Sequence, residues 1–145
     1  MVFPRKFFKE HMLNGAPRGT LGLPNPSGWM TAELFLQVLE HFIKYSSSWK
    51  ENPSLLIFDN HESHVTVEVI MKAREAGVHI LTLPPHCSNK LQPLDVTVFG
   101  PFKAYYNAEC EAWLLNHPGA PIKIYNIAEL VGTAHDKALV PQNIR

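Results

Sequence analysis

The residues best suited to chemistry are two aspartates that each follow an apolar run. Asp59 comes directly after the run at residues 55–58, and Asp95 ends a loop that follows the run at residues 78–83. Short runs that are apolar throughout are typical of parallel strands buried on both faces. Because ligands of open α/β sheets bind beyond the carboxyl ends of the strands, we expect both carboxylates to reach one cleft.

Such a pair of carboxylates predicts a site for magnesium or manganese. Carboxylate oxygens are the hard ligands that Mg²⁺ binds together with substrate phosphates. Ions held on either side of a phosphorus atom promote in-line phosphoryl transfer. The sequence has neither a glycine-rich phosphate loop nor a serine nucleophile elbow, so those two chemistries are disfavoured.

Two other interpretations of these residues stay open. Asp59 or Asn60 could simply cap the helix that follows, since both residue types are preferred there. A zinc site is the second interpretation, although irregular spacing disfavours it. Its ligands would be His61, His64, His86 and Cys87.

Helices are predicted to alternate with the two strands. Apolar side chains recur at steps of three and four over residues 31–45, with Thr31 as the N-cap. A second helix is predicted over residues 65–76, closed by Gly77. Its inward-facing residues are expected to be Val69, Ile70 and Ala73. The order strand, helix, strand with short connections predicts a parallel crossover and an α/β fold.

The rest of the chain is predicted to be largely helical. Beyond a loop at residues 86–93, aromatic side chains recur at helical spacing over residues 99–113. We interpret this stripe, and Trp29, as core residues rather than as platforms for stacking bases. A last helix is predicted to begin at Asn126, with Glu129 completing a capping box.

Composition indicates one folded domain without a strong charge preference. The chain has 145 residues, of which 46% are hydrophobic and 18% charged, and its formal net charge is zero. A domain that grips DNA unaided usually carries excess positive charge. We interpret the thin basic cluster near the start as a solvated face; its members are Arg5, Lys6, Lys9 and Arg18. No apolar run is long enough to span a bilayer.

Ordered sequence blocks surround the two aspartates. Residues 55–64 read LLIFDNHESH, and residues 83–95 read LPPHCSNKLQPLD. A Phe-Lys pair follows these two blocks at residues 102–103, and Ser-Gly-Trp precedes both blocks at residues 27–29. Over essentially the whole chain, these blocks resemble the second and third acidic blocks of DDE-type transposases of the pogo, Tigger and Jerky kind.

The resemblance implies a ribonuclease-H-like fold that acts on DNA in the nucleus. By the family's pattern, Asp59 and Asp95 would be catalytic ligands of Mg²⁺ or Mn²⁺. His64 would contact a phosphate or orient Asp59, and an interpretation as a simple polar residue in the first turn of the following helix stays open beside these roles. The other residues that the resemblance suggests as substrate contacts are Asn60, Gln92 and Lys103.

The sequence departs from the family's pattern in one respect. The family's first catalytic aspartate lies upstream on the first strand, and no aspartate precedes Asp59 here. We therefore expect a partial fold, with two parallel strands and flanking helices and with the first three strands missing. Its predicted parts are a strand stub and loop at 1–30, core elements at 31–116 and a helical extension at 117–145.

This partial fold carries three further expectations. By itself the chain should not cleave DNA, because one of three carboxylates is absent. It should self-associate through the open edge of strand 55–58. Another class of function also fits the sequence, namely a domesticated scaffold that binds nucleic acid or another protein without catalysis.

Overall fold

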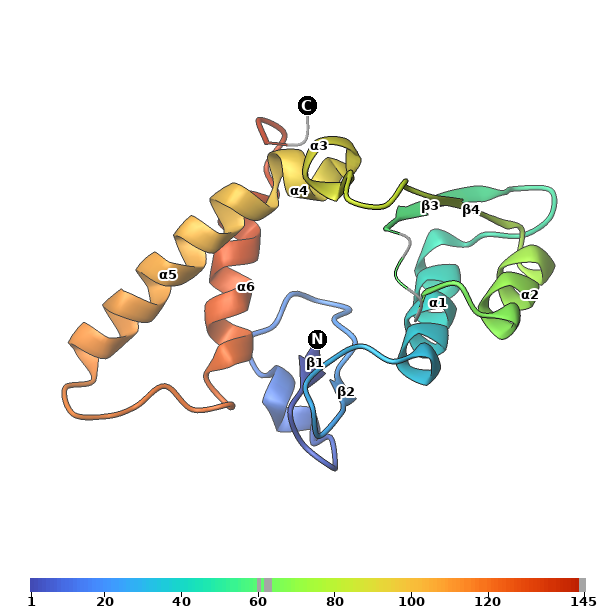
Figure 1. Ribbon diagram of the computed structural model, residues 1–145. Helices are drawn as coiled ribbons and strands as arrows, with labels where there is room; N and C mark the ends of the chain where they lie inside the picture. The colour runs from blue at the N-terminus through green and yellow to red at the C-terminus, as the bar shows by residue number, and fades with distance from the viewer. Residues whose placement is uncertain (60, 62–63, 144–145) are drawn as a thin grey trace. The chain divides into compact units, whose positions relative to one another are not determined.

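The computed structural model describes residues 1–59, 61 and 64–143, except for the side chains of residues 88 and 89. The chain divides into two compact units. One is Trp29–Gln92, and the other combines Met1–Gly28 with Pro93–Arg145 (Figure 1). The two candidate aspartates lie in different units. We refer to these units as the Asp59 unit and the Asp95 unit.

The Asp59 unit is built on a parallel pair of strands. Strand β3 (Ser54–Phe58) lies beside β4 (Val78–Thr82), with Ser54 opposite Val78. Helix α2 (Val67–Glu75) lies between the two strands in the sequence and packs against β4. The α/β class and the predicted parallel crossover are confirmed. In the described residues β3 pairs only with β4, and the expected self-association through its other edge stays a prediction.

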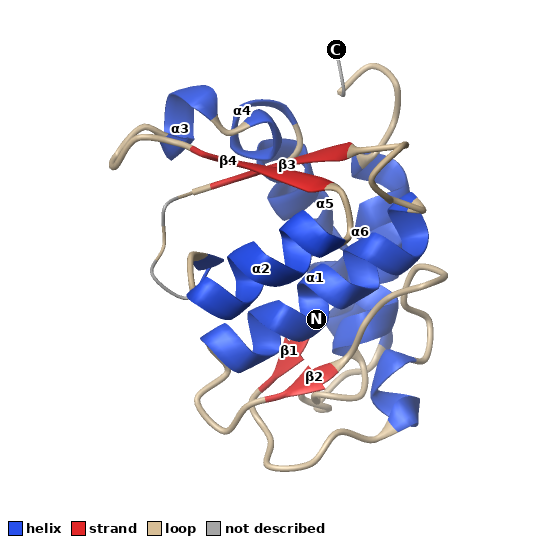
Figure 2. Ribbon diagram, turned by 90° about the vertical axis from the view of Figure 1, so that its right-hand side faces the viewer, coloured by secondary structure: helices blue, strands red, loops and turns tan. Residues whose placement is uncertain are grey.

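The core of this unit lies between the strands and two helices. Helix α1 (Ala32–Ser46) contributes one apolar stripe, and α2 contributes another. Both helices lie on the same side of the strands (Figure 2). The buried cluster consists of Phe35, Leu39, Phe58, Val69, Ala73 and Val78. The helical predictions for residues 31–45 and 65–76 are confirmed by α1 and α2, and most of their periodic apolar positions pack in this core.

The prediction that both strands are buried on both faces is wrong. Leu55 on β3 is 59% exposed and Leu81 on β4 is 49% exposed, because side chains alternate along a strand and both helices cover the other face. Ile70 is 40% exposed, so its predicted inward position is also wrong. It is adjacent to Val69, and only Val69 falls on the stripe that meets the core.

Side-chain caps and a glycine define the ends of these helices. The hydroxyl oxygens of Thr31 and Thr66 accept hydrogen bonds from Leu34 N and Val69 N, at 3.4 and 3.3 Å. The predicted N-cap at Thr31 is confirmed. Gly77 follows α2 with φ of +69°, a left-handed conformation in which a Cβ atom would also approach Trp49 O to 2.2 Å.

Short helices occupy the predicted loop at residues 86–93. Helix α3 (Ser88–Leu91) lies within that range, and α4 (Pro93–Thr97) begins at its end. The prediction of a loop was wrong here because segments of four and five residues are too short to show a helical period. Pro93 occupies the first position of α4, where a missing N–H is tolerated.

The Asp95 unit is mainly helical. Helix α5 (Phe99–Asn116) packs along α6 (Ile127–Ala138), and α6 also contacts the 3₁₀ helix η1 (Glu10–Leu13). Strand β1 (Val2–Phe3) pairs in parallel with β2 (Leu23–Pro24). The strand at the start was predicted, whereas its partner lies in a segment predicted to be a loop.

Two details of the helical predictions need correction. The side chain of Asn126 does not cap α6, because its Oδ1 atom instead accepts a hydrogen bond from Lys123 N at 2.9 Å. The predicted capping box is therefore absent. The aromatic stripe of α5 is only half-buried at Phe102, Tyr106 and Trp113, so it forms a partly covered face rather than a closed core.

Candidate functional site

Asp59 lies at the carboxyl end of β3, held by two hydrogen bonds. Its Oδ1 atom accepts from His61 N at 3.3 Å and lies 2.9 Å from His64 Nδ1. The side chain is 49% exposed. A carboxylate on a rigid strand end, oriented by fixed donors and open to solvent, is suited to binding a ligand. Asn60, the neighbouring candidate, lies outside the described residues.

His64 is fixed by the aromatic core. Its ring centroid lies 4.3 Å from that of Phe35 and 5.4 Å from that of Phe58, and its side chain is 19% exposed. In this pair we assign His64 Nδ1–H as the donor and Asp59 Oδ1 as the acceptor of the hydrogen bond. The imidazole thereby joins the carboxylate to the packed interior of the unit.

A hollow of about 330 Å³ opens beside this pair. Trp29, Met30 and His61 complete its lining together with Asp59 and His64. Trp29 is 78% exposed, so its interpretation as a core residue was wrong. The periodic pattern that predicts α1 begins after Trp29 and Met30, which is why neither was predicted to line a site.

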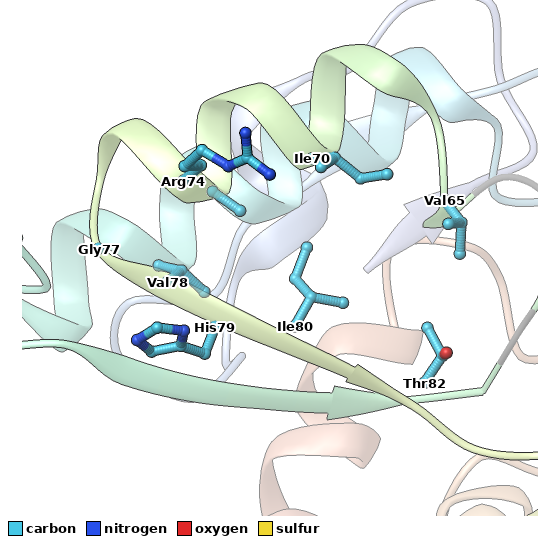
Figure 3. Close-up of a pocket in the computed structure, with 9 residues that line it drawn as sticks. Val65, Ile70, Arg74, Gly77, Val78, His79, Ile80 and Thr82 are labelled. Carbon is cyan, nitrogen blue, oxygen red and sulfur yellow. The ribbon is translucent and has the colours of Figure 1, made fainter.

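A second hollow of about 440 Å³ lies between α2 and β4 (Figure 3). Apolar side chains such as Ile70 and Ile80 line it, and Arg74 and His79 stand among them. It shares no lining residue with the hollow at Asp59 and contains no carboxylate. We therefore assign the candidate site to the hollow at Asp59.

The Asp95 block is less constrained. Asp95 lies in the first turn of α4 and is exposed, and its carboxylate has no hydrogen bond or ion pair within the described residues. Lys103 is exposed on α5. The Oε1 atom of Gln92 is buried and has no hydrogen-bond partner in the part of the chain that the structure describes. That Asp59 and Asp95 share one cleft stays a prediction.

The donor chemistry fits a hard divalent cation. Mg²⁺ and Mn²⁺ prefer carboxylate oxygens and keep several water molecules, so one or two protein carboxylates suffice to hold them. The half-exposed carboxylate of Asp59 meets that requirement. Among residues 1–59, 61 and 64–143, no group of three or more histidine, cysteine, aspartate or glutamate side chains is placed to hold a metal ion, and nothing supports the zinc interpretation.

Comparison with known proteins identifies the family. The profile described as DDE superfamily endonuclease matches residues 24–145. This range includes both aspartates and the residues around them. The chain belongs to the DDE superfamily endonuclease family, which confirms the resemblance to DDE-type proteins. No solved structure matches the chain.

One curated relative is similar to most of the chain. The protein called MFS-type transporter clz9, from Cochliobolus lunatus, is 40% identical over 102 residues. The match covers 70% of this chain but only 11% of that protein. In the described segments, no helix is long and apolar enough to cross a membrane.

Proposed function

We propose that this chain forms part of a metal-dependent centre for DNA strand cleavage and joining, with Asp59 and Asp95 as ligands of Mg²⁺ or Mn²⁺. The hydrogen-bonded, half-exposed carboxylate of Asp59 at a strand end carries this proposal. Membership of an endonuclease family supports DNA as the substrate. The nucleus is proposed as the place of action on the resemblance alone. When bound, the ions would stabilise negative charge on the reacting phosphate and activate the attacking oxygen.

The residues around the aspartates would hold the reacting groups in place. His64 donates a hydrogen bond to Asp59 and keeps its carboxylate in one orientation. Lys103 offers an exposed ammonium group to a phosphate. The amide of Gln92, which has an unsatisfied oxygen, would contact the substrate. Asn60 is proposed for the same role on the family's pattern.

We further propose that these two aspartates do not suffice for cleavage. On the family's pattern the centre would need a third carboxylate, and the sequence has no aspartate ahead of Asp59. The missing ligand would come from another segment or from another chain. This stretch would therefore bind metal weakly and leave DNA intact when tested by itself.

Manganese binding tests this proposal. Free Mn²⁺ is measured by electron paramagnetic resonance in the presence of the wild-type chain and of Asp59→Asn. The wild type should bind Mn²⁺, and the variant should bind at least about tenfold more weakly, since it loses a charged ligand. Supercoiled plasmid should stay intact with either protein in Mg²⁺.

Two results would contradict the proposal. Equal Mn²⁺ binding by the two proteins would show that Asp59 is not a metal ligand. Nicking that Asp59→Ala abolishes would show that the chain completes its own catalytic centre. If Mn²⁺ binding is absent while DNA is bound, a non-catalytic nucleic-acid scaffold becomes the better description.

A further inference from the structure

A basic and aromatic surface lies in the Asp95 unit, outside the hollow at Asp59. The loop at residues 4–9 exposes Arg5, Lys6, Phe7 and Lys9, and Phe7 is 69% exposed. The Nζ atom of Lys6 lies 5.5 Å from the centroid of the Phe7 ring. We call residues 4–9 the basic loop.

The basic loop is anchored at both ends. Phe3, which precedes it on β1, is 3% exposed. The Phe8 ring lies 6.0 Å from the Phe3 ring and fills the space beside Gly22, where a Cβ atom would approach it to 2.3 Å. Because Phe8 packs inward, the adjacent Phe7 is held outward. Phe7 thereby lacks the stabilisation that an aromatic side chain normally gains from burial.

A hollow of about 370 Å³ extends this surface. Arg5 and Lys123 both line it, and its walls include Val2, Phe3 and Ile127. The hollow thus joins the basic loop to the segment that leads into α6. An apolar wall with cations around it suits a flat apolar group that carries negative charge at its edge.

Few acidic residues offset the positive charge of this surface. Glu10 is the only acidic residue among residues 1–28, and none occurs over residues 117–126. Within the described residues, no carboxylate pairs with the basic side chains of this surface, which are Arg5, Lys6, Lys9 and Lys123. The chain as a whole is neutral, so positive charge is concentrated here.

We infer that this surface binds a single-stranded stretch of DNA. Its cations would contact phosphates, Phe7 would stack on one base and the hollow at Arg5 and Lys123 would receive another. Cations together with exposed aromatic rings are how proteins bind unpaired strands, because every base has a face on which to stack. Duplex DNA hides those faces. The inference rests on the proposed function in taking DNA as the substrate, and it adds a contact that needs no metal.

Binding to a fluorescein-labelled oligonucleotide of twenty thymidines tests the inference in EDTA, by fluorescence anisotropy. Phe7→Ala should weaken binding by about tenfold or more, the usual effect of losing one stacked base. Salt dependence is measured as the slope of the logarithm of the binding constant against the logarithm of the salt concentration. In the variant with Arg5, Lys6 and Lys123 all changed to Ala, the magnitude of this slope should fall by about 0.7 per cation removed. A duplex of the same length should bind without sensitivity to Phe7→Ala.

The chain offers a matched control in the other unit. The Nζ atom of Lys44 lies 5.6 Å from the ring of Tyr45, which is 61% exposed. Changing both to Ala removes an exposed ammonium group and an exposed aromatic ring, as the double change of Lys6 and Phe7 to Ala does, and should leave oligonucleotide binding unchanged. An equal loss in this control and in Phe7→Ala would overturn the inference, as would binding of anionic lipid vesicles in place of DNA.

The variant with Asp59→Asn and Asp95→Asn separates this inference from the proposed function. It should keep its oligonucleotide affinity in EDTA even where its Mn²⁺ binding is lost. If the basic-loop variants keep their oligonucleotide affinity while the double aspartate variant loses Mn²⁺ binding, the inference fails and the metal site stands. If Mn²⁺ binding is unaffected but the basic-loop variants lose DNA, the proposed function fails and the inference stands.

Discussion

The two aspartates occupy different structural settings. Asp59 follows a strand of five residues whose last side chain, Phe58, is buried in the core. Its carboxylate receives a hydrogen bond from His64. Asp95 is exposed in a helix of five residues, none of which is buried.

In the proposed metal centre, this difference would make the two aspartates contribute unequally to binding. The fixed carboxylate of Asp59 would lose little conformational freedom on binding a cation. Asp95 would have to be ordered by the ligand, at a cost in conformational entropy. We therefore expect the Asp59 unit to respond strongly to substitutions in its support, and the Asp95 block to respond weakly.

The largest effect is expected from Phe35→Ala. This change removes a ring that packs against both Phe58 and His64, and loss of a buried phenylalanine costs about 3–5 kcal/mol of unfolding free energy. Leu94→Ala, at a residue of α4 that is 42% exposed, should change stability by about 0.5 kcal/mol or less. Urea denaturation followed by circular dichroism measures both, and equal losses would break the comparison.

A smaller effect is expected from His64→Ala. Loss of the hydrogen bond that orients a ligating carboxylate typically weakens metal binding by about 10–100-fold. His79→Ala is the control, because His79 is exposed on β4 and lies outside the hollow at Asp59. Mn²⁺ titration compares the two variants. The orienting role of His64 would be refuted if both variants bound Mn²⁺ as the wild type does.

The threonine caps provide a third test. Thr31→Ala and Thr66→Ala each remove a side-chain acceptor at a helix start, at a cost of about 1 kcal/mol. Thr97→Ala removes only a bond to Pro93 O within the exposed helix α4 and should cost about 0.5 kcal/mol or less. Thermal unfolding distinguishes these values. A greater loss for Thr97→Ala would mean that α4 supports the fold more than its exposure indicates.

The smallest effect concerns acid stability. Hydrogen bonds to its own backbone amide and to the Thr31 hydroxyl hold the pKa of Glu33 below its usual 4.5. A lowered pKa in the folded state stabilises the protein above pH 4.5, and that contribution is lost as pH falls through the folded value. Glu33→Gln should therefore reduce the decline of the unfolding free energy between neutral and acidic pH. An unchanged acid profile would contradict the role given to this cap.

The sequence was most informative where long apolar patterns meet a core. The stripe of α1 and the run of β3 predict elements that the structure contains, because Phe35, Leu39 and Phe58 are buried by the same unit. Asp59 could be placed at a strand end from the same pattern. For His64 the sequence leaves open a phosphate contact, an orienting role at Asp59 or a polar residue in a first helical turn. The hydrogen bond to Asp59 and the packing on Phe35 favour the orienting role.

Other features leave too weak a signal in the sequence. Strands of two residues, such as β1 and β2, show no alternation. The one-sided cover of β3 depends on both helices packing on the same face, which an unbroken apolar run does not specify. The exposure of Phe7 likewise depends on the packing of Phe8 against Phe3 and beside Gly22, which the sequence does not specify.

The central claim is that Asp59 and Asp95 bind one metal centre, and a double-mutant cycle tests it most directly. Mn²⁺ affinity is measured for the wild type, Asp59→Asn, Asp95→Asn and the double variant. A shared centre predicts that each single change removes most of the affinity and that the double change adds little, giving a coupling of about 1 kcal/mol or more. Strictly additive losses, or an Asp95→Asn variant that binds Mn²⁺ as the wild type does, would contradict the claim.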